Sequence, residues 1–259
     1  MRPRVTEGTR NLPVTRHNGC VTTSNSPVLA GFAHGTSSAE GQAATALLMR
    51  AVAEAHPSLD VRLGYIDVQQ PDPAATLGAV ESGRPVIVVP LLLSAGYHVH
   101  VDLTEAVRAE SDRQVILTGA LGPDARLTDL LRLRLSEAGI TDDDVIVLAV
   151  AGSSDARAVA DCHVVRAELA ALLDRDVAVG FLSAATPRLP DAVAAARAAH
   201  PARRIVVSSY LLAPGYFQSL AEAAGADVVT QPLLLSAGPA PAQLVDVVAS
   251  RYTDALATL

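Results

Sequence analysis

The sequence contains no lysine, because all 20 of its basic residues are arginine. This absence excludes Schiff-base and pyridoxal enzymes, which need a lysine amine, and Walker-type phosphate loops, whose lysine reaches the nucleotide phosphates. Tryptophan is also absent and only 3% of the residues are aromatic, which argues against the stacking platforms of single-stranded nucleic-acid binders. The net charge of −7 argues against a phosphate backbone as partner. No nucleic-acid partner is therefore expected.

Cysteine and long apolar runs are scarce as well. Cys20 and Cys162 lie far apart and form no C-x-x-C pair, so neither a disulfide framework nor a zinc knuckle is indicated. No apolar run reaches the roughly 18–20 residues that a membrane span needs. Residues 1–26 have no apolar core of a secretory signal and no periodicity. We expect a disordered tail, a cytoplasmic protein and no membrane partner.

Short apolar runs alternate with segments of helical periodicity over the rest of the chain. The predicted strands are Val28–Ala33, Val61–Val68, Pro85–Leu93, Gln114–Thr118 and Val145–Ala151, and the predicted helices cover 40–56, 73–82, 101–110 and 124–138. This alternation predicts a doubly wound α/β fold with helices on both faces of a parallel sheet. The continuous apolar strands agree, because a parallel sheet is buried on both faces.

The pattern then restarts. Val145–Ala151 and the glycine loop after it repeat Val28–Ala33 and its loop, and Arg204–Leu212 repeats Val86–Leu93. A repeat unit of roughly 115–120 residues is a domain duplication rather than a solenoid. The sequence thus predicts two tandem, related α/β domains.

The domain boundaries follow from this repeat. After the tail, residues 27–140 form the first half, which we expect to carry the active site. Residues 141–259 form the second half, a degenerate copy of the same fold, and the Asp-rich stretch Thr141–Asp144 is the joint between them.

Three polar residues of the first half have no metal-ligating counterpart in the second. In the two halves, His34 corresponds to Ala151, Asp67 to Ser183, and His98 to Phe217. His34 and His98 follow the first and third predicted strands and Asp67 lies at the end of the second, so all three should project from the carboxyl edge of the sheet, where α/β proteins bind ligands. Adjacent strands lie about 4.8 Å apart, so convergence on one ion is feasible.

Two imidazoles and a carboxylate suit a borderline divalent metal such as Fe²⁺, Co²⁺, Ni²⁺ or Zn²⁺. Taken singly, each residue has an ordinary structural alternative, since histidines and acids at strand ends commonly cap the next helix or bond a loop. The joint pattern favours the metal site.

The segments that carry these residues resemble a known family. They are Ala33–Ser37, Tyr65–Pro71 (YIDVQQP) and Val89–Asp102 (VPLLLSAGYHVHVD). The chain resembles the class II tetrapyrrole chelatases, specifically the two-repeat sirohydrochlorin chelatases of the CbiX/SirB type, over essentially everything but the tail.

The resemblance implies a lyase that inserts Fe²⁺ or Co²⁺ (Ni²⁺ in some relatives) into sirohydrochlorin without ATP, in siroheme or cobalamin biosynthesis. It implies no cofactor beyond this substrate metal. His34 and His98 would be the metal-binding and catalytic pair, with His34 also taking protons from the pyrrole nitrogens. Relatives have Glu where this chain has Asp67. The Asp side chain is one methylene shorter, so its carboxylate reaches a bound metal ion less directly.

The resemblance also implies contacts with the macrocycle. The positions concerned are Gln70, Leu93, Ser94, Ala95, Gly96 and Tyr97. Because the substrate is rich in carboxylates and the protein is acidic, we expect local arginines to bind it through bidentate contacts. Arg126 and Arg188 follow strand ends and are the candidates. Asp102 is expected to begin the helix after the His98 loop.

Two other functions stay open. The chain could be a non-catalytic carrier that binds the tetrapyrrole or the metal without inserting it. It could also be a metal-dependent hydrolase, although such an enzyme would normally have more carboxylates at the strand ends. Two fused halves can form a cleft internally, so a monomer is expected.

Overall fold

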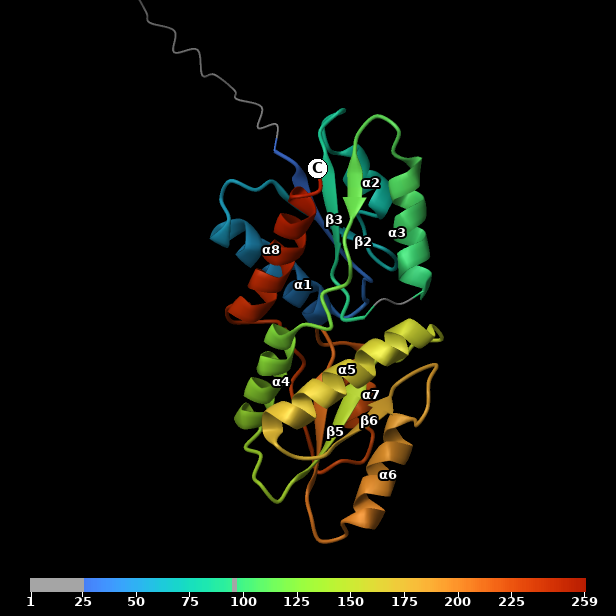
Figure 1. The fold of residues 1–259 in the computed structure, drawn as a ribbon, viewed down its shortest axis with the longest axis vertical. Coiled ribbons are helices and arrows are strands. Elements are labelled where there is room, and N and C mark those ends of the chain that lie inside the picture. Colours follow the sequence, from blue (N-terminus) through green and yellow to red (C-terminus); the bar gives the residue numbers. More distant parts are fainter. Residues whose placement is uncertain (1–25, 95–96) are drawn as a thin grey trace, which may run out of the picture.

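The computed structural model describes residues 26–94 and 97–259, with only the backbone path for residues 97–102. The predicted disordered tail, residues 1–26, falls almost entirely outside the described residues. Within them, the strands form two separate four-stranded parallel sheets, each covered by helices on both faces (Figure 1). The predicted α/β fold with two related domains is therefore confirmed.

The first half supplies the first sheet. Its elements in order are β1 (Val28–Ala33), α1 (Ala39–Ala55), β2 (Val61–Tyr65), α2 (Pro73–Gly78), β3 (Val86–Pro90), α3 (Tyr97–Ala109), β4 (Val115–Leu117) and α4 (Ala125–Glu137).

The second half repeats this series. Its elements are β5 (Val145–Val150), α5 (Ala156–Leu173), β6 (Val177–Phe181), α6 (Leu189–Ala199), β7 (Ile205–Tyr210), α7 (Tyr216–Glu222), β8 (Val228–Val229) and α8 (Ala242–Leu256). Each of these described helices is too short or too polar to span a lipid bilayer.

Both sheets have the same strand order, β2-β1-β3-β4 and β6-β5-β7-β8. In the first sheet, Ala33 at the end of β1 is in register with Tyr65 at the end of β2, while Phe32 pairs with Pro90 of β3. The three strands therefore end together. Because β2 lies on one side of β1 and β3 on the other, the order in which strands are added changes sides between β2 and β3. This is the switch point at which doubly wound folds bind ligands.

The last helix of each half packs on the sheet of the other half. Helix α8 lies against α1 and β3, and α4 lies against α5 and β7; Figure 1 shows α8 beside the upper sheet and α4 beside the lower one. The predicted division at residues 140 and 141 follows the sequence repeat, whereas in space one helix of each part is exchanged. As a result, buried side chains of both halves belong to one continuous apolar core.

An arginine on each exchanged helix donates hydrogen bonds to backbone carbonyls in a loop of the other half. Arg134 of α4 is 6% exposed, and its guanidinium donates to the carbonyl oxygens of Pro232 and Leu233 at 3.0 and 2.8 Å. Arg251 of α8 donates in the same way to the carbonyls of Ala120 and Leu121, both at 2.8 Å. The two clamps are reciprocal, so each half satisfies backbone carbonyls of the other.

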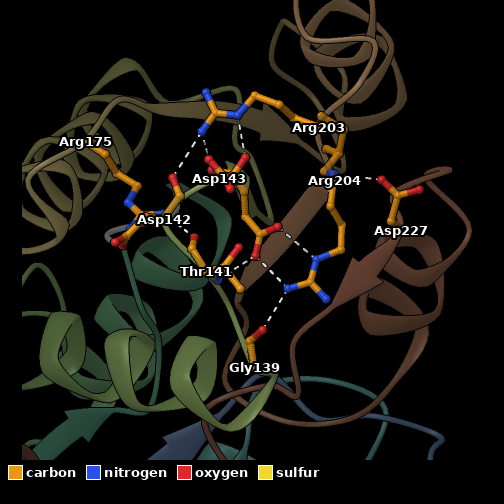
Figure 2. A network of polar contacts seen from close by, with 10 residues as sticks. Gly139, Thr141, Asp142, Asp143, Arg175, Arg203, Arg204 and Asp227 are labelled. Atoms are coloured by element: carbon orange, nitrogen blue, oxygen red, sulfur yellow. Dashed lines mark hydrogen bonds and ion pairs between the residues drawn. The ribbon is translucent and has the colours of Figure 1, made fainter.

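The joint between the halves is a network of arginines and acids (Figure 2). The guanidinium of Arg204 makes two bonds to the buried carboxylate of Asp144, at 2.9 and 2.6 Å, and Asp144 also accepts the Thr141 backbone N–H at 2.7 Å. Arg175 and Arg203 bond the same segment from neighbouring loops. The hydrogen bond from Arg204 lowers the pKa of Asp144 from 3.8 to about 2.

This lowered pKa makes part of the stability dependent on pH. A carboxylate whose pKa is lower in the folded state contributes stability that is present above pH 3.8 and is lost as the pH falls through about 2. We expect Asp144→Asn to be less stable than wild type at pH 7 but to lose less stability between pH 4 and 2. Urea unfolding across this range measures the difference. Asp143→Asn, at an exposed neighbouring carboxylate, is the control, and an Asp144→Asn acid profile parallel to wild type would contradict the prediction.

Several predicted boundaries are wrong. The strands predicted to end at Val68 and Leu93 end at Tyr65 and Pro90, and the helix predicted over 73–82 ends at Gly78. Helix α3 begins at Tyr97, four residues before the predicted start, because no Gly or Pro interrupts the chain between Gly96 and Ala109. Asp102 therefore lies within the helix and does not begin it. The change places His98 in the first turn of α3, directly after the β3 loop.

Candidate active site

A cleft of about 660 Å³ lies between the carboxyl edges of the two sheets. The first half lines it with residues 33–36 after β1 and residues 91–94 after β3. The second half lines it with residues 150–154, 183–184 and 210–217, which follow β5, β6 and β7. Its volume falls in the range of small-molecule sites, about 300–1,000 Å³. The duplication thus builds one shared cleft from equivalent loops of both halves.

His34 is an exposed imidazole on the wall of this cleft. It follows β1, a strand whose six residues are all buried, so its position at the strand end is fixed by the sheet. The loop after it is tied down by side chains: the Thr36 backbone N–H donates to Gln69 Oε1 at 2.9 Å, and Gln42 Nε2 donates to the Thr36 carbonyl at 2.8 Å. The sequence prediction for the location of His34 agrees with this placement.

Asp67 packs beneath the His34 loop through its backbone. Its N–H donates to the His34 carbonyl at 2.9 Å, and its own carbonyl oxygen would lie only 2.0 Å from a Cβ at Gly35. Its carboxylate is exposed, accepts the Val68 N–H at 2.7 Å, and is not among the residues that line the cleft. In this arrangement the carboxylate accepts a backbone hydrogen bond within the turn and does not face the cleft.

The turn at Val68 is strained and is repeated in the second half. Val68 has φ of 63°, and the Gln69 N–H bonds the Asp67 carbonyl at 2.6 Å, which is the bond of a γ-turn. Ala184 has φ of 53° and the same bond pattern. A β-branched residue at positive φ is a true outlier, and such strain concentrates at functional sites. The turn fixes which side chains after β2 and β6 face the cleft.

The metal site predicted from His34, Asp67 and His98 stays a prediction. His98 belongs to α3 by its backbone, but its side chain lies outside the described residues. Among the side chains that are described, no three of the His, Cys, Asp and Glu groups come together as metal ligands. Among the described residues that line the cleft, His34 is the one that carries an imidazole.

The predicted macrocycle contacts divide into three groups. Leu93 and Ser94 line the cleft. Ala95, Gly96 and the side chain of Tyr97 lie outside the described residues.

The third group is Gln70, which is exposed and does not line the cleft; its Oε1 accepts the Asp72 N–H at 3.0 Å. Gln69 lines the cleft in its place. No sequence pattern distinguishes these adjacent glutamines, because the strained turn at Val68 decides which one faces inward.

The expected basic patch is not found among the described residues that line the cleft, since none of them is an arginine. Arg126 pairs with Asp124 at 2.8 Å and donates to Ser250 Oγ at 2.8 Å, so it joins α4 to α8. Arg188 donates to the Leu182 carbonyl. Both candidates are used to hold the fold. Besides the imidazole of His34 and the amide of Gln69, the described residues that line the cleft bring side-chain hydroxyls, including those of Thr36, Ser153 and Ser154.

Two buried residues that the sequence did not point to as part of a site, Tyr210 and Cys162, line the cleft. Tyr210 ends β7 and its hydroxyl donates to the Leu93 carbonyl at 3.2 Å, which ties the second half to the loop after β3. Burial raises the pKa of Tyr210 well above its ordinary range and that of the Cys162 thiol to about 11. Both groups are therefore protonated at neutral pH, and Cys162 does not act there as a thiolate ligand.

A comparison with protein families identifies the chain. The model of the CbiX family matches residues 29–138 and 145–219, which together are more than half of the sequence. The chain belongs to the CbiX family. The match breaks between the two repeats, at the joint formed by Thr141–Asp144.

Individual relatives agree with this CbiX membership. A sirohydrochlorin cobaltochelatase from Sulfolobus acidocaldarius is 30% identical over 81 residues, which are 30% of this chain and 66% of that enzyme. The chain thus spans slightly less than two thirds of that relative.

Solved structures share the fold of this CbiX-family chain. SirB from Bacillus subtilis, solved with Fe³⁺, superposes with a TM-score of 0.75 at 19% identity, over 88% of this chain and 95% of SirB. CbiX, the terminal enzyme of siroheme biosynthesis in denitrifying bacteria, superposes with a TM-score of 0.60 at 18% identity, over 86% and 98% of the two chains. The two-sheet architecture is common to all three.

Proposed function

We propose that this chain is a sirohydrochlorin chelatase that inserts a divalent metal ion, Fe²⁺ or Co²⁺, into the macrocycle without ATP, in siroheme or cobalamin biosynthesis. The observation that carries the proposal is the exposed imidazole of His34 on the wall of the cleft, at the position where the second half has Ala151. CbiX-family membership and the names of the relatives support the substrate class.

The reaction sets three tasks. Water must leave the ion, two pyrrole N–H protons must leave the ring, and the ion must reach the ring from one face. A neutral imidazole binds borderline metals and exchanges protons near neutral pH, so His34 can hold the ion and accept a proton as the ring nitrogens replace its ligands. His98, in the first turn of α3, is the proposed second metal ligand.

The rest of the cleft suits a flat, largely apolar ligand. Leu91, Leu93, Leu211 and Leu212 line it, so the macrocycle can be desolvated while its carboxylates meet hydroxyls, backbone N–H groups and solvent at the rim. No nucleotide is required by this scheme, in keeping with a sequence that has no lysine for a Walker loop.

The test uses purified protein, metal-free sirohydrochlorin and Fe²⁺, Co²⁺ or Ni²⁺ in turn, under anaerobic conditions without ATP. We expect the absorbance of the metallated product to form faster than in protein-free controls and to exceed one equivalent per protein. Tight binding of the tetrapyrrole with no more than one equivalent of product would instead favour a carrier. Rates equal to the protein-free control together with no binding would contradict both.

A further inference from the structure

Two exposed aromatic side chains stand side by side on the second half's wall of the cleft. Tyr216 and Phe217 open helix α7, their ring centroids lie 6.1 Å apart, and their planes differ by 35°. Tyr216 is 74% exposed and Phe217 is 37% exposed, and both line the cleft.

Their exposure is exceptional in this protein. The remaining described tyrosines and phenylalanines are all buried: Phe32, Tyr65, Phe181, Tyr210 and Tyr252. A chain with only 3% aromatic residues thus leaves an adjacent pair in solvent at the edge of the cleft between the two sheets. Exposed apolar side chains that gather at a groove are typical of ligand-binding sites.

The position of the pair follows from the duplication. Tyr216 and Phe217 begin the helix after β7, as Tyr97 and His98 begin the helix after β3. Phe217 therefore stands where the first half has its predicted metal ligand, and a phenyl ring has no nitrogen, oxygen or sulfur atom with which to coordinate a transition-metal ion.

The start of α7 is also held close to the first half. A Cβ at Gly41 of α1 would lie only 2.4 Å from the Pro214 carbonyl oxygen, and one at Gly215 would lie 3.5 Å from Thr36 Oγ1. These contacts seat the aromatic pair against the loop that carries His34. Both walls of the cleft are thus near enough to share one ligand.

We propose that Tyr216 and Phe217 form a stacking platform for the tetrapyrrole, on the wall of the cleft that lacks the histidines. This inference rests on the proposed function, and it names residues that position the substrate. Aromatic rings pack against one another in offset or tilted arrangements. The conjugated macrocycle offers a π-surface against which both rings can pack in this way. The metal then reaches the ring from the His34 side, because the platform offers the other face no imidazole.

The test measures binding of metal-free sirohydrochlorin by absorbance titration, and steady-state metal insertion, for Tyr216→Ala, Phe217→Ala and the double variant. We expect each single change to raise the Kd about tenfold, as loss of one stacking partner does elsewhere. KM for the tetrapyrrole should rise while kcat at saturation changes little. Tyr216→Phe and Phe217→Tyr should bind like wild type, because they keep the rings.

Leu172→Ala is the matched control, since Leu172 is 42% exposed on α5 and does not line the cleft. Its Kd should equal that of wild type, and urea unfolding should show all variants folded. If the double Ala variant binds sirohydrochlorin as tightly as wild type, the platform is overturned while the chelatase function stands. If wild type neither binds nor metallates sirohydrochlorin, both proposals fail together.

Discussion

His34→Ala is expected to reduce metal insertion by about 10²–10⁴-fold, the usual contribution of a positioned acid–base group, and to leave the free energy of unfolding unchanged. The loss follows from the two tasks proposed for one imidazole, holding the ion and accepting a pyrrole proton. Stability should not change, because the side chain is exposed and only the backbone carbonyl of His34 bonds Asp67. Anaerobic insertion assays followed by absorbance, with urea unfolding in parallel, measure both quantities.

His200→Ala is the matched control, because His200 is an exposed imidazole at the end of α6 and does not line the cleft. It should insert metal at the wild-type rate. Added free imidazole should partly restore the His34→Ala rate, since the cleft is open to solvent. Near-wild-type insertion by His34→Ala would refute the catalytic assignment.

Gly35→Ala is expected to lower the free energy of unfolding by about 2–5 kcal/mol, from left-handed backbone strain together with overpacking. Gly35 has φ of +96°, and a Cβ there would lie 2.0 Å from the backbone oxygen of Asp67. A backbone oxygen cannot swing aside as a side chain can, so the loops after β1 and β2 must separate. Because His34 precedes this glycine, metal insertion should fall as well. Urea unfolding and the insertion assay report the two effects.

Two other glycines separate the causes. Gly83 has φ of +76°, and no atom lies within 4 Å of the place that a Cβ would take there, so Gly83→Ala should cost only the backbone strain, about 1–2 kcal/mol. Gly152 has φ of +86° and the same 2.0 Å approach, to the Ser183 oxygen. Gly152→Ala should therefore match Gly35→Ala in stability loss but reduce insertion less, since Ala151 is no ligand. A Gly35→Ala variant as stable as Gly83→Ala would disprove the clash.

Part of the candidate site was readable from the sequence because it sits on regular elements. The predicted strand Val28–Ala33 coincides with β1, and a parallel strand puts the next residue at the carboxyl edge, so the position of His34 followed directly. The neighbouring loop positions did not follow. Whether Gln69 or Gln70 lines the cleft depends on a positive φ at Val68, and apolar periodicity carries no information about such a turn.

The contacts made by the arginines also could not be predicted from the sequence. Composition predicts that carboxylate contacts come from arginine, yet Arg126 and Arg188 bond Asp124 and the Leu182 carbonyl. Sequence reveals that a side chain is charged but not which partner it reaches. That choice depends on which loops the fold brings near it.

The sequence by itself determined the alternation of strands and helices, the duplication, the absence of lysine chemistry and the loss of His34 and His98 from the second half. It could do so because these features are local or are repeated along the chain. The tertiary structure alone decided that α4 and α8 exchange sheets, that Arg134 and Arg251 clamp the opposite half, and that equivalent loops share one cleft. An apolar helix face predicts burial, but several sheets can bury it equally well, and only packing of the whole chain selects one.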